Sequence, residues 1–130
     1  MNYARQSART AYQGNAIATA SPARLLVMLF ERLVLDAERG QVALLSGARE
    51  EANQQLVHAQ AIVTELQSTL NVDAMPAGQE LLALYDYLQR LFVKANVSQD
   101  QIAAAEAVRL SRHLCDTWRQ AAMLAAAASA

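Results

Sequence analysis

Residues 21–35 read Ser-Pro-Ala-Arg-Leu-Leu-Val-Met-Leu-Phe-Glu-Arg-Leu-Val-Leu, and this stretch decides the fold. Ser21 is a preferred N-cap residue and Pro22 suits the first helical position, so we expect a helix to begin here. The apolar run 25–30 covers every direction around a helix with about 3.6 residues per turn. A helix that is apolar all round is buried, so the stretch predicts a bundle with extra cover over this helix.

This first helix is expected over residues 22–45, and two glycines lie near its end. Gly47 is typical of the left-handed residue that terminates a helix. Gly40 lies inside the helix, where glycine costs about 1 kcal/mol relative to alanine. The sequence leaves open whether Gly40 marks a close helix contact or a weak point.

Three further helices follow from apolar residues that recur every three or four positions. Over residues 48–70 the apolar seam consists of Ala52, Leu56, Ala59, Val63, Leu66 and Leu70. Over residues 79–95 it consists of Leu81, Tyr85, Leu88, Phe92 and Ala95. The last helix runs into the terminal alanine tract, with the seam Ala103, Ala107, Leu110, Leu114, Thr117, Ala121 and Leu124. Ser98 and Gln101 fit a capping box that would open this helix.

The composition supports an all-α chain. Hydrophobic residues make up 54% of the sequence, and only 4 glycines and 2 prolines interrupt it. Runs that alternate β-branched and aromatic residues, which are typical of strands, are missing from the sequence. Four helices with short connections predict an antiparallel four-helix bundle. We expect residues 21–130 to form this single domain and residues 1–20 to form an irregular N-terminal arm.

Charge and cysteine content argue against several partners and compartments. The net charge is −1, whereas nucleic acids and anionic membranes call for a basic surface. Cys115 is the single cysteine, which suggests a reducing compartment. The N-terminal residues lack the apolar core of a signal peptide, and no apolar stretch is long enough to cross a membrane. We therefore expect a cytoplasmic protein that neither binds nucleic acid nor inserts into membranes.

The sequence offers no constellation for catalysis or metal binding. His58 and His113 lie on different expected helices, and the residues three positions before them are Gln55 and Leu110 rather than the glutamates of di-iron bundles. Zinc spacings of Cys-x-x-Cys or His-Glu-x-x-His type do not occur. We therefore expect no enzymatic activity, no cofactor and no metal site.

More apolar surface is present than a four-helix core needs. Besides the run 25–30, the helix over residues 79–95 carries apolar side chains outside its seam, namely Leu82, Leu84, Tyr87 and Leu91. A large apolar surface on a soluble protein marks an interaction site. The residues alone leave open whether this surface is a site for a partner chain, or whether it completes a slightly thicker core or a homodimer contact.

The order of motifs resembles the flagellar secretion chaperones of the FliS type along nearly the whole chain. The matching stretches are Ala11-Tyr12-Gln13-Gly14-Asn15, Thr19-Ala20-Ser21-Pro22, the run 25–30, Ala59 to Leu66, Leu84-Tyr85-Asp86-Tyr87-Leu88-Gln89-Arg90, Lys94-Ala95-Asn96 and Asp116-Thr117-Trp118-Arg119. The chain departs from the family pattern at Glu31-Arg32, where an acidic or Asn residue is usually followed by glycine.

The resemblance implies a cytoplasmic chaperone that binds the disordered C-terminal segment of flagellin and presents it to the cytoplasmic domain of the type III export gate. Apolar grooves would receive short helices of this segment. The expected cargo-binding residues are Leu25, Leu29, Phe30, Leu84, Tyr87 and Leu91. In the N-terminal arm, Tyr12 and Ile17 are expected to contact the bundle or the export gate. A self-associating bundle without cargo is the alternative.

Overall fold

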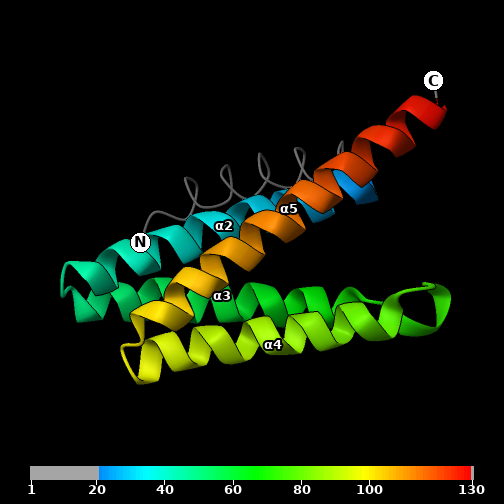
Figure 1. The fold of residues 1–130 in the computed structure, drawn as a ribbon. Coiled ribbons are helices and arrows are strands. Elements are labelled where there is room, and N and C mark those ends of the chain that lie inside the picture. Colours follow the sequence, from blue (N-terminus) through cyan, green and yellow to red (C-terminus); the bar gives the residue numbers. More distant parts are fainter. Residues whose placement is uncertain (1–20, 130) are drawn as a thin grey trace, which may run out of the picture.

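The computed structural model describes residues 21–129. In this range the chain forms four long helices and one short 3-10 helix. They are α2 (Pro22–Leu45), α3 (Arg49–Thr69), η1 (Val72–Ala74), α4 (Gly78–Val97) and α5 (Gln101–Ser129). Successive long helices run in opposite directions (Figure 1). The predicted all-α antiparallel four-helix bundle is confirmed, whereas the N-terminal arm with Tyr12 and Ile17 lies outside the described residues.

Helix α2 begins and ends where the local sequence predicts. The Ser21 hydroxyl accepts a hydrogen bond from the Arg24 amide at 3.1 Å, and Pro22 occupies the first turn. At the other end Gly47 adopts φ 76°, a left-handed conformation that suits glycine. The Ala48 amide then donates to the Ala43 carbonyl at 2.9 Å, which closes the helix end.

The predicted start of the last helix is wrong. Ser98 is the C-cap of α4, and α5 begins only at Gln101. The Asp100 carboxylate caps α5 by accepting a hydrogen bond from the Ala103 amide at 2.9 Å. Gln99, at φ 53°, reverses the chain between the two helices. The position of the chain reversal thus determines which residue caps α5. The hydrogen bond from the Ala103 amide lowers the pKa of Asp100, and the nearby Lys94 lowers it by a smaller amount.

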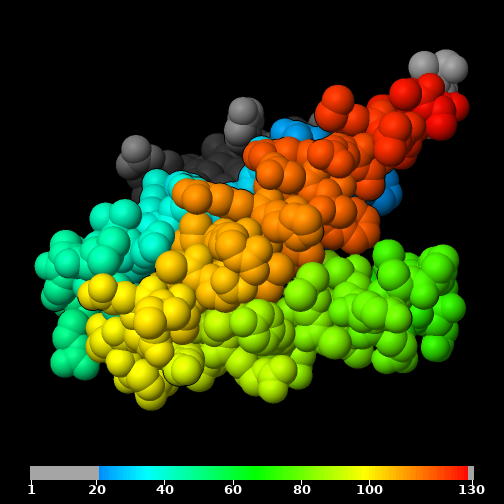
Figure 2. All heavy atoms as spheres, viewed as in Figure 1, coloured from blue at the N-terminus to red at the C-terminus, as the bar shows by residue number. Residues whose placement is uncertain are grey.

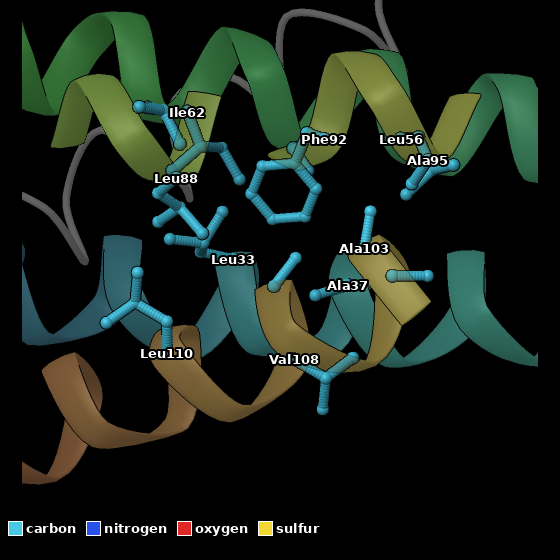
Figure 3. Close-up of a cluster of buried hydrophobic side chains, with 14 of the residues drawn as sticks. Leu33, Ala37, Leu56, Ile62, Leu88, Phe92, Ala95, Ala103, Val108 and Leu110 are labelled. Atoms are coloured by element: carbon cyan, nitrogen blue, oxygen red, sulfur yellow. The ribbon is translucent and has the colours of Figure 1, made fainter. Parts of the chain in front are cut away.

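The core lies on the axis of the bundle and draws on all four long helices. Figure 3 shows side chains of the four helices, such as Leu33, Leu88, Phe92 and Leu110, pointing toward one another. The seam predicted for α3 is buried from Ala52 to Leu66, and Leu70 is half-buried. Tyr85, Leu88, Phe92 and Ala95 of α4 are also buried. The seams of α3 and α4 are therefore confirmed, with Leu70 and Leu81 at the margin of the core.

Gly40 marks a close contact between α2 and α3. A Cβ atom at this position would lie 2.6 Å from Cδ2 and 2.9 Å from Cγ of Leu56. Leu56 is fully buried, so it has little room to move away. Gly40 therefore marks a close contact between two helices and not a weak point of α2.

The seam predicted for the last helix is only half right. Ala103, Ala107, Leu110 and Leu114 are buried, but Thr117, Ala121 and Leu124 are exposed. The reason is the path of α5, which crosses the bundle obliquely and extends beyond it at its C-terminal end (Figure 1). The apolar period continues in this half of α5, but the other described helices provide no wall for it to pack against.

Candidate functional site

One end of the bundle is open. The start of α2, the end of α3, the start of α4 and the end of α5 meet at this end because consecutive helices are antiparallel. Here α5 moves away from α4, and Figure 2 shows the molecule hollowed between the end of α5 and the connection from α3 to α4. We call this region the open end. The opposite end, which carries the tight α2–α3 and α4–α5 turns, is the closed end.

Apolar side chains that the core does not fully cover gather at the open end. The hydrophobic residues that pack against the core while remaining partly exposed are Leu26, Leu29, Val34, Leu70, Leu81, Leu84, Leu91 and Trp118. Most of them belong to the segments that meet at the open end. Removing such surface from water stabilises by about 25 cal/mol per Å², so this end favours contact with another apolar chain.

Trp118 joins α5 to the core at the open end. Its ring stacks on Phe30, with ring centroids 6.1 Å apart and an interplanar angle of 14°. Phe30 in turn lies against Tyr85, at a centroid distance of 6.3 Å. Burial raises the pKa of Tyr85 to about 12, against a smaller lowering effect of its hydrogen bond with Trp118. The three rings fix where α5 leaves the core.

Beyond Trp118, α2 and α5 form the two walls of a groove of about 970 Å³. The wall from α2 comprises Ser21, Pro22, Ala23, Arg24 and Val27. The wall from α5 comprises Arg119, Ala122, Met123, Ala125 and Ala126. Small side chains dominate both walls, so a helix lying in this α2–α5 groove could approach the two backbones closely. Helix-in-groove recognition uses such surfaces.

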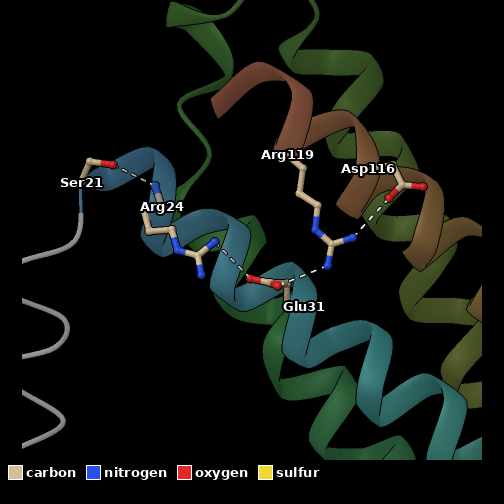
Figure 4. A network of polar contacts seen from close by, with 5 residues as sticks. All are labelled: Ser21, Arg24, Glu31, Asp116 and Arg119. Atoms are coloured by element: carbon tan, nitrogen blue, oxygen red, sulfur yellow. Dashed lines mark hydrogen bonds and ion pairs between the residues drawn. The ribbon is translucent and has the colours of Figure 1, made fainter. Parts of the chain in front are cut away.

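Ion pairs connect α2 to α5 next to this groove. Glu31 lies between two arginines, with Arg24 at 3.5 Å and Arg119 at 3.2 Å (Figure 4). Arg119 also donates to Asp116 at 3.3 Å. The hydrogen bond to Glu31 raises the pKa of Arg119 above that of a free guanidinium. Glu31 supplies the acidic residue of the family pattern, and here it ties the two helices together, whereas Arg32 stands where that pattern has glycine.

The residues expected to bind cargo lie on two helices that are not neighbours. Leu25 and Leu29 are half-buried on α2, and Phe30 is fully buried in the core. On α4, Leu84 and Leu91 are half-buried and Tyr87 is exposed. Both helices pack on α3 and α5, so α2 and α4 lie diagonally across the bundle. Phe30 is covered by Trp118, whereas the other five side chains have surface that a partner could reach.

The α2–α5 groove is not apparent from the sequence. Its residues lie far apart in the sequence, and its α5 wall consists mostly of alanines, which read as ordinary helix formers. Met123 is 71% exposed, and its place in the groove depends on the oblique path of α5. The sequence signal for the groove was that α5 remains apolar beyond Leu114, the last large buried residue of its seam.

A buried carboxylate between α2 and α3 was also missed. Asp36 is fully buried, and it accepts hydrogen bonds from Arg32, at 3.1 Å, and from the Nδ1 atom of His58. These partners satisfy the carboxylate, as the interior requires. Among residues 21–129 no group of three His, Cys, Asp or Glu side chains is arranged to hold a metal ion. The hydrogen bond between Asp36 and His58 connects α2 to α3.

The comparisons with known proteins agree. The sequence profile of the family described as "Flagellar protein FliS" matches residues 4–125. The chain is 34% identical over 116 residues to the flagellar secretion chaperone FliS of Bacillus subtilis (strain 168), covering 89% of this chain and 86% of that protein. It is 27% identical over 108 residues to the flagellar secretion chaperone FliS of Escherichia coli (strain K12), covering 82% and 79%.

A solved structure described as the crystal structure of a flagellar chaperone from bacteria has the same fold. The TM-score is 0.71 at 22% sequence identity, and the match covers 92% of this chain and 98% of that chain. Within residues 21–129, no helix combines the length and the apolar character that crossing a bilayer requires.

A helical bundle with a largely apolar groove at one open end is, by its surface, a protein that binds another chain. The family match over residues 4–125 then gives the particular family. The chain belongs to the FliS family of flagellar secretion chaperones, and its role is that of a chaperone in flagellar export. Chaperones of this family are in general not enzymes.

Proposed function

We propose that this protein binds the disordered C-terminal segment of flagellin in the cytoplasm, prevents its premature polymerisation and delivers it to the flagellar type III export gate. The family supports a chaperone role in flagellar export. The observation that carries the proposal is the gathering of half-buried apolar side chains and the α2–α5 groove at one end of the bundle.

The physical mechanism is the burial of apolar side chains from both partners. A segment that orders on binding loses conformational entropy, so a large wrapped surface is needed for useful affinity. Cargo helices would present apolar residues at three- and four-residue spacing to the open end. The proposed contacts on the bundle are Leu25, Leu29, Phe30, Leu84, Tyr87 and Leu91, and Phe30 becomes available only if Trp118 moves.

Residues 1–20 have a separate proposed role. Tyr12 and Ile17 are proposed to contact the bundle or the cytoplasmic domain of the export gate. A pull-down of the loaded chaperone with that domain would check this role, with Tyr12→Ala and Ile17→Ala as the variants. Unchanged capture by both variants would exclude these two residues as gate contacts.

Isothermal titration tests the main proposal. A peptide comprising the last few dozen residues of flagellin from the same organism is titrated into the full chain in the absence of nucleotide. We expect saturable one-to-one binding with a negative heat-capacity change, because apolar surface is buried. A peptide of scrambled sequence is the control. Absence of heat together with unchanged mobility in native gels would reject the proposal.

The alternative function is self-association through the same surface. It is favoured by the exposed side chains of Met123 and Leu124, which are 71% and 72% accessible at the end of α5. Sedimentation velocity with and without the flagellin peptide separates the two functions. A chaperone that forms homodimers only without cargo dissociates when the peptide is added, whereas a self-associating structural module does not respond.

A further inference from the structure

The α2–α5 groove has two cations at one end. Its residues run from Ser21 to Val27 on α2 and from Arg119 to Ala126 on α5, and the helices are antiparallel. Val27 and Arg119 therefore lie at the inner end, and Ser21 and Ala126 at the outer end. Among residues 21–129, the charged side chains that line the groove are Arg24 and Arg119, one from each wall.

The inner end of the groove is bridged. Arg119 of α5 reaches Glu31 of α2 at 3.2 Å, and Arg24 reaches the same carboxylate at 3.5 Å (Figure 4). Glu31 is not part of the groove lining. A chain that continued inward along the groove would have to climb over this connection between the two walls. A chain that ends at this point would avoid the obstacle.

Both arginines keep donors for a further anion. A guanidinium carries five N–H groups, and the ion pairs of Arg24 and Arg119 engage only some of them. The two side chains are 59% and 48% accessible, so a ligand in the groove can reach them. Arginine binds carboxylates well because its planar fork matches the two oxygens.

We propose that the α2–α5 groove receives the extreme C-terminus of the flagellin segment, and that Arg24 and Arg119 bind its terminal α-carboxylate. Apolar side chains of the last cargo turns then lie against Val27, Ala122 and Met123. This inference rests on the proposed function and adds to it a direction of binding: the cargo chain enters over Ser21 and Ala126 and ends at the arginines.

The test compares two peptides that differ in one group. Both comprise the last few dozen residues of flagellin from the same organism; one ends in the free acid and the other in the amide. Titrated into the full chain, the free acid is expected to bind about tenfold more tightly than the amide, as charge-assisted hydrogen bonds at the groove would give. Added salt should reduce this difference, because the arginines are partly exposed.

Variants of the chaperone assign the effect to the two arginines. In the Arg24→Gln or Arg119→Gln variant, the affinities of the free acid and the amide should differ less than in the native chain. In the variant with both substitutions, the two affinities should be equal. The matched control is Arg112→Gln, which removes another α2–α5 ion pair, with Glu38 at 2.8 Å, outside the groove. This variant should keep the full preference for the free acid. Circular dichroism would verify that each variant is folded.

Equal affinity of the two peptides for the native chain would overturn the inference while leaving the proposed function intact. A third peptide, with its acidic side chains replaced by amides and its terminus free, checks the other source of a carboxylate. Suppose that this third peptide binds the native chain no more tightly than it binds the double arginine variant, whereas the amide-terminated peptide still binds the native chain more tightly. The arginines then bind an acidic side chain of the cargo, and the inference is wrong. If no peptide binds, the proposed function itself fails.

Discussion

The two ends of the bundle are built from the same helices but differ in how well they are sealed. At the closed end Gly40 lets α2 and α3 come into close contact, and α5 lies in the core through Ala103 and Ala107. At the open end α5 remains helical but moves away from α4, and Met123 and Leu124 are exposed in the described part of the chain. Helix formation and burial are therefore separate properties: the first half of α5 contributes buried side chains to the core, whereas most of the second half is equally helical but exposed.

The largest expected effect comes from removing a ring of the sealed core. Phe92 is fully buried, so Phe92→Ala should lower the free energy of unfolding by about 3–5 kcal/mol, through lost burial and the cavity that remains. Urea denaturation followed by circular dichroism measures this change. A loss below about 1 kcal/mol would mean that the core is less tightly packed than its burial indicates.

The close contact at the closed end can be tested by adding one methyl group. Gly40→Ala gains about 1 kcal/mol of helix propensity but forces Leu56 aside, and overpacking costs about 1–3 kcal/mol. We expect a net loss of about 1 kcal/mol. In a Leu56→Ala background the clash is gone, so the same substitution should stabilise. Destabilisation of equal size in both backgrounds would contradict the contact.

At the open end a substitution should change binding and leave folding intact. Met123→Ser is expected to alter the free energy of unfolding by less than about 0.5 kcal/mol, because the side chain is exposed. Affinity for the flagellin peptide should fall by roughly fivefold as an apolar contact is lost. The control is Leu124→Ser, which is equally exposed but does not line the groove. Equal losses in both variants would argue against the groove as the contact.

The smallest effect concerns the cap that starts α5 at the closed end. The Ala103 hydrogen bond lowers the pKa of Asp100 in the folded state. Its stabilisation is therefore complete above the pKa of an unfolded aspartate and is lost as the pH falls through the lowered folded pKa. Asp100→Asn should flatten this acid dependence of the melting temperature. Melting curves of the native chain and of the variant, recorded as the pH is lowered, measure the difference. An unchanged acid profile in the variant would exclude Asp100 as its source.

Features that depend on interactions between residues close in the sequence were predictable, and features that depend on distant residues were not. The start of α2 was predictable because Ser21 and Pro22 act on their own first turn. The start of α5 was not, because both Ser98 and Asp100 can cap a helix and the reversal at Gln99 selects between them. For the candidate site, the run 25–30 showed that the chain has more apolar residues than the core needs. It did not show that the partly exposed ones would gather at the open end of the bundle.

The sequence by itself determined the helical class, the number of long helices, the α3 and α4 seams and the family, because these depend on local propensity, apolar period and ordered motifs. The tertiary structure decided that Asp36 is buried against His58, that α5 leaves the core after Trp118, and that Arg24 and Arg119 share one groove. The physical reason is that an apolar period belongs to a single helix. Burial and ion pairing depend on which distant helix lies opposite, and that is fixed only when the bundle packs.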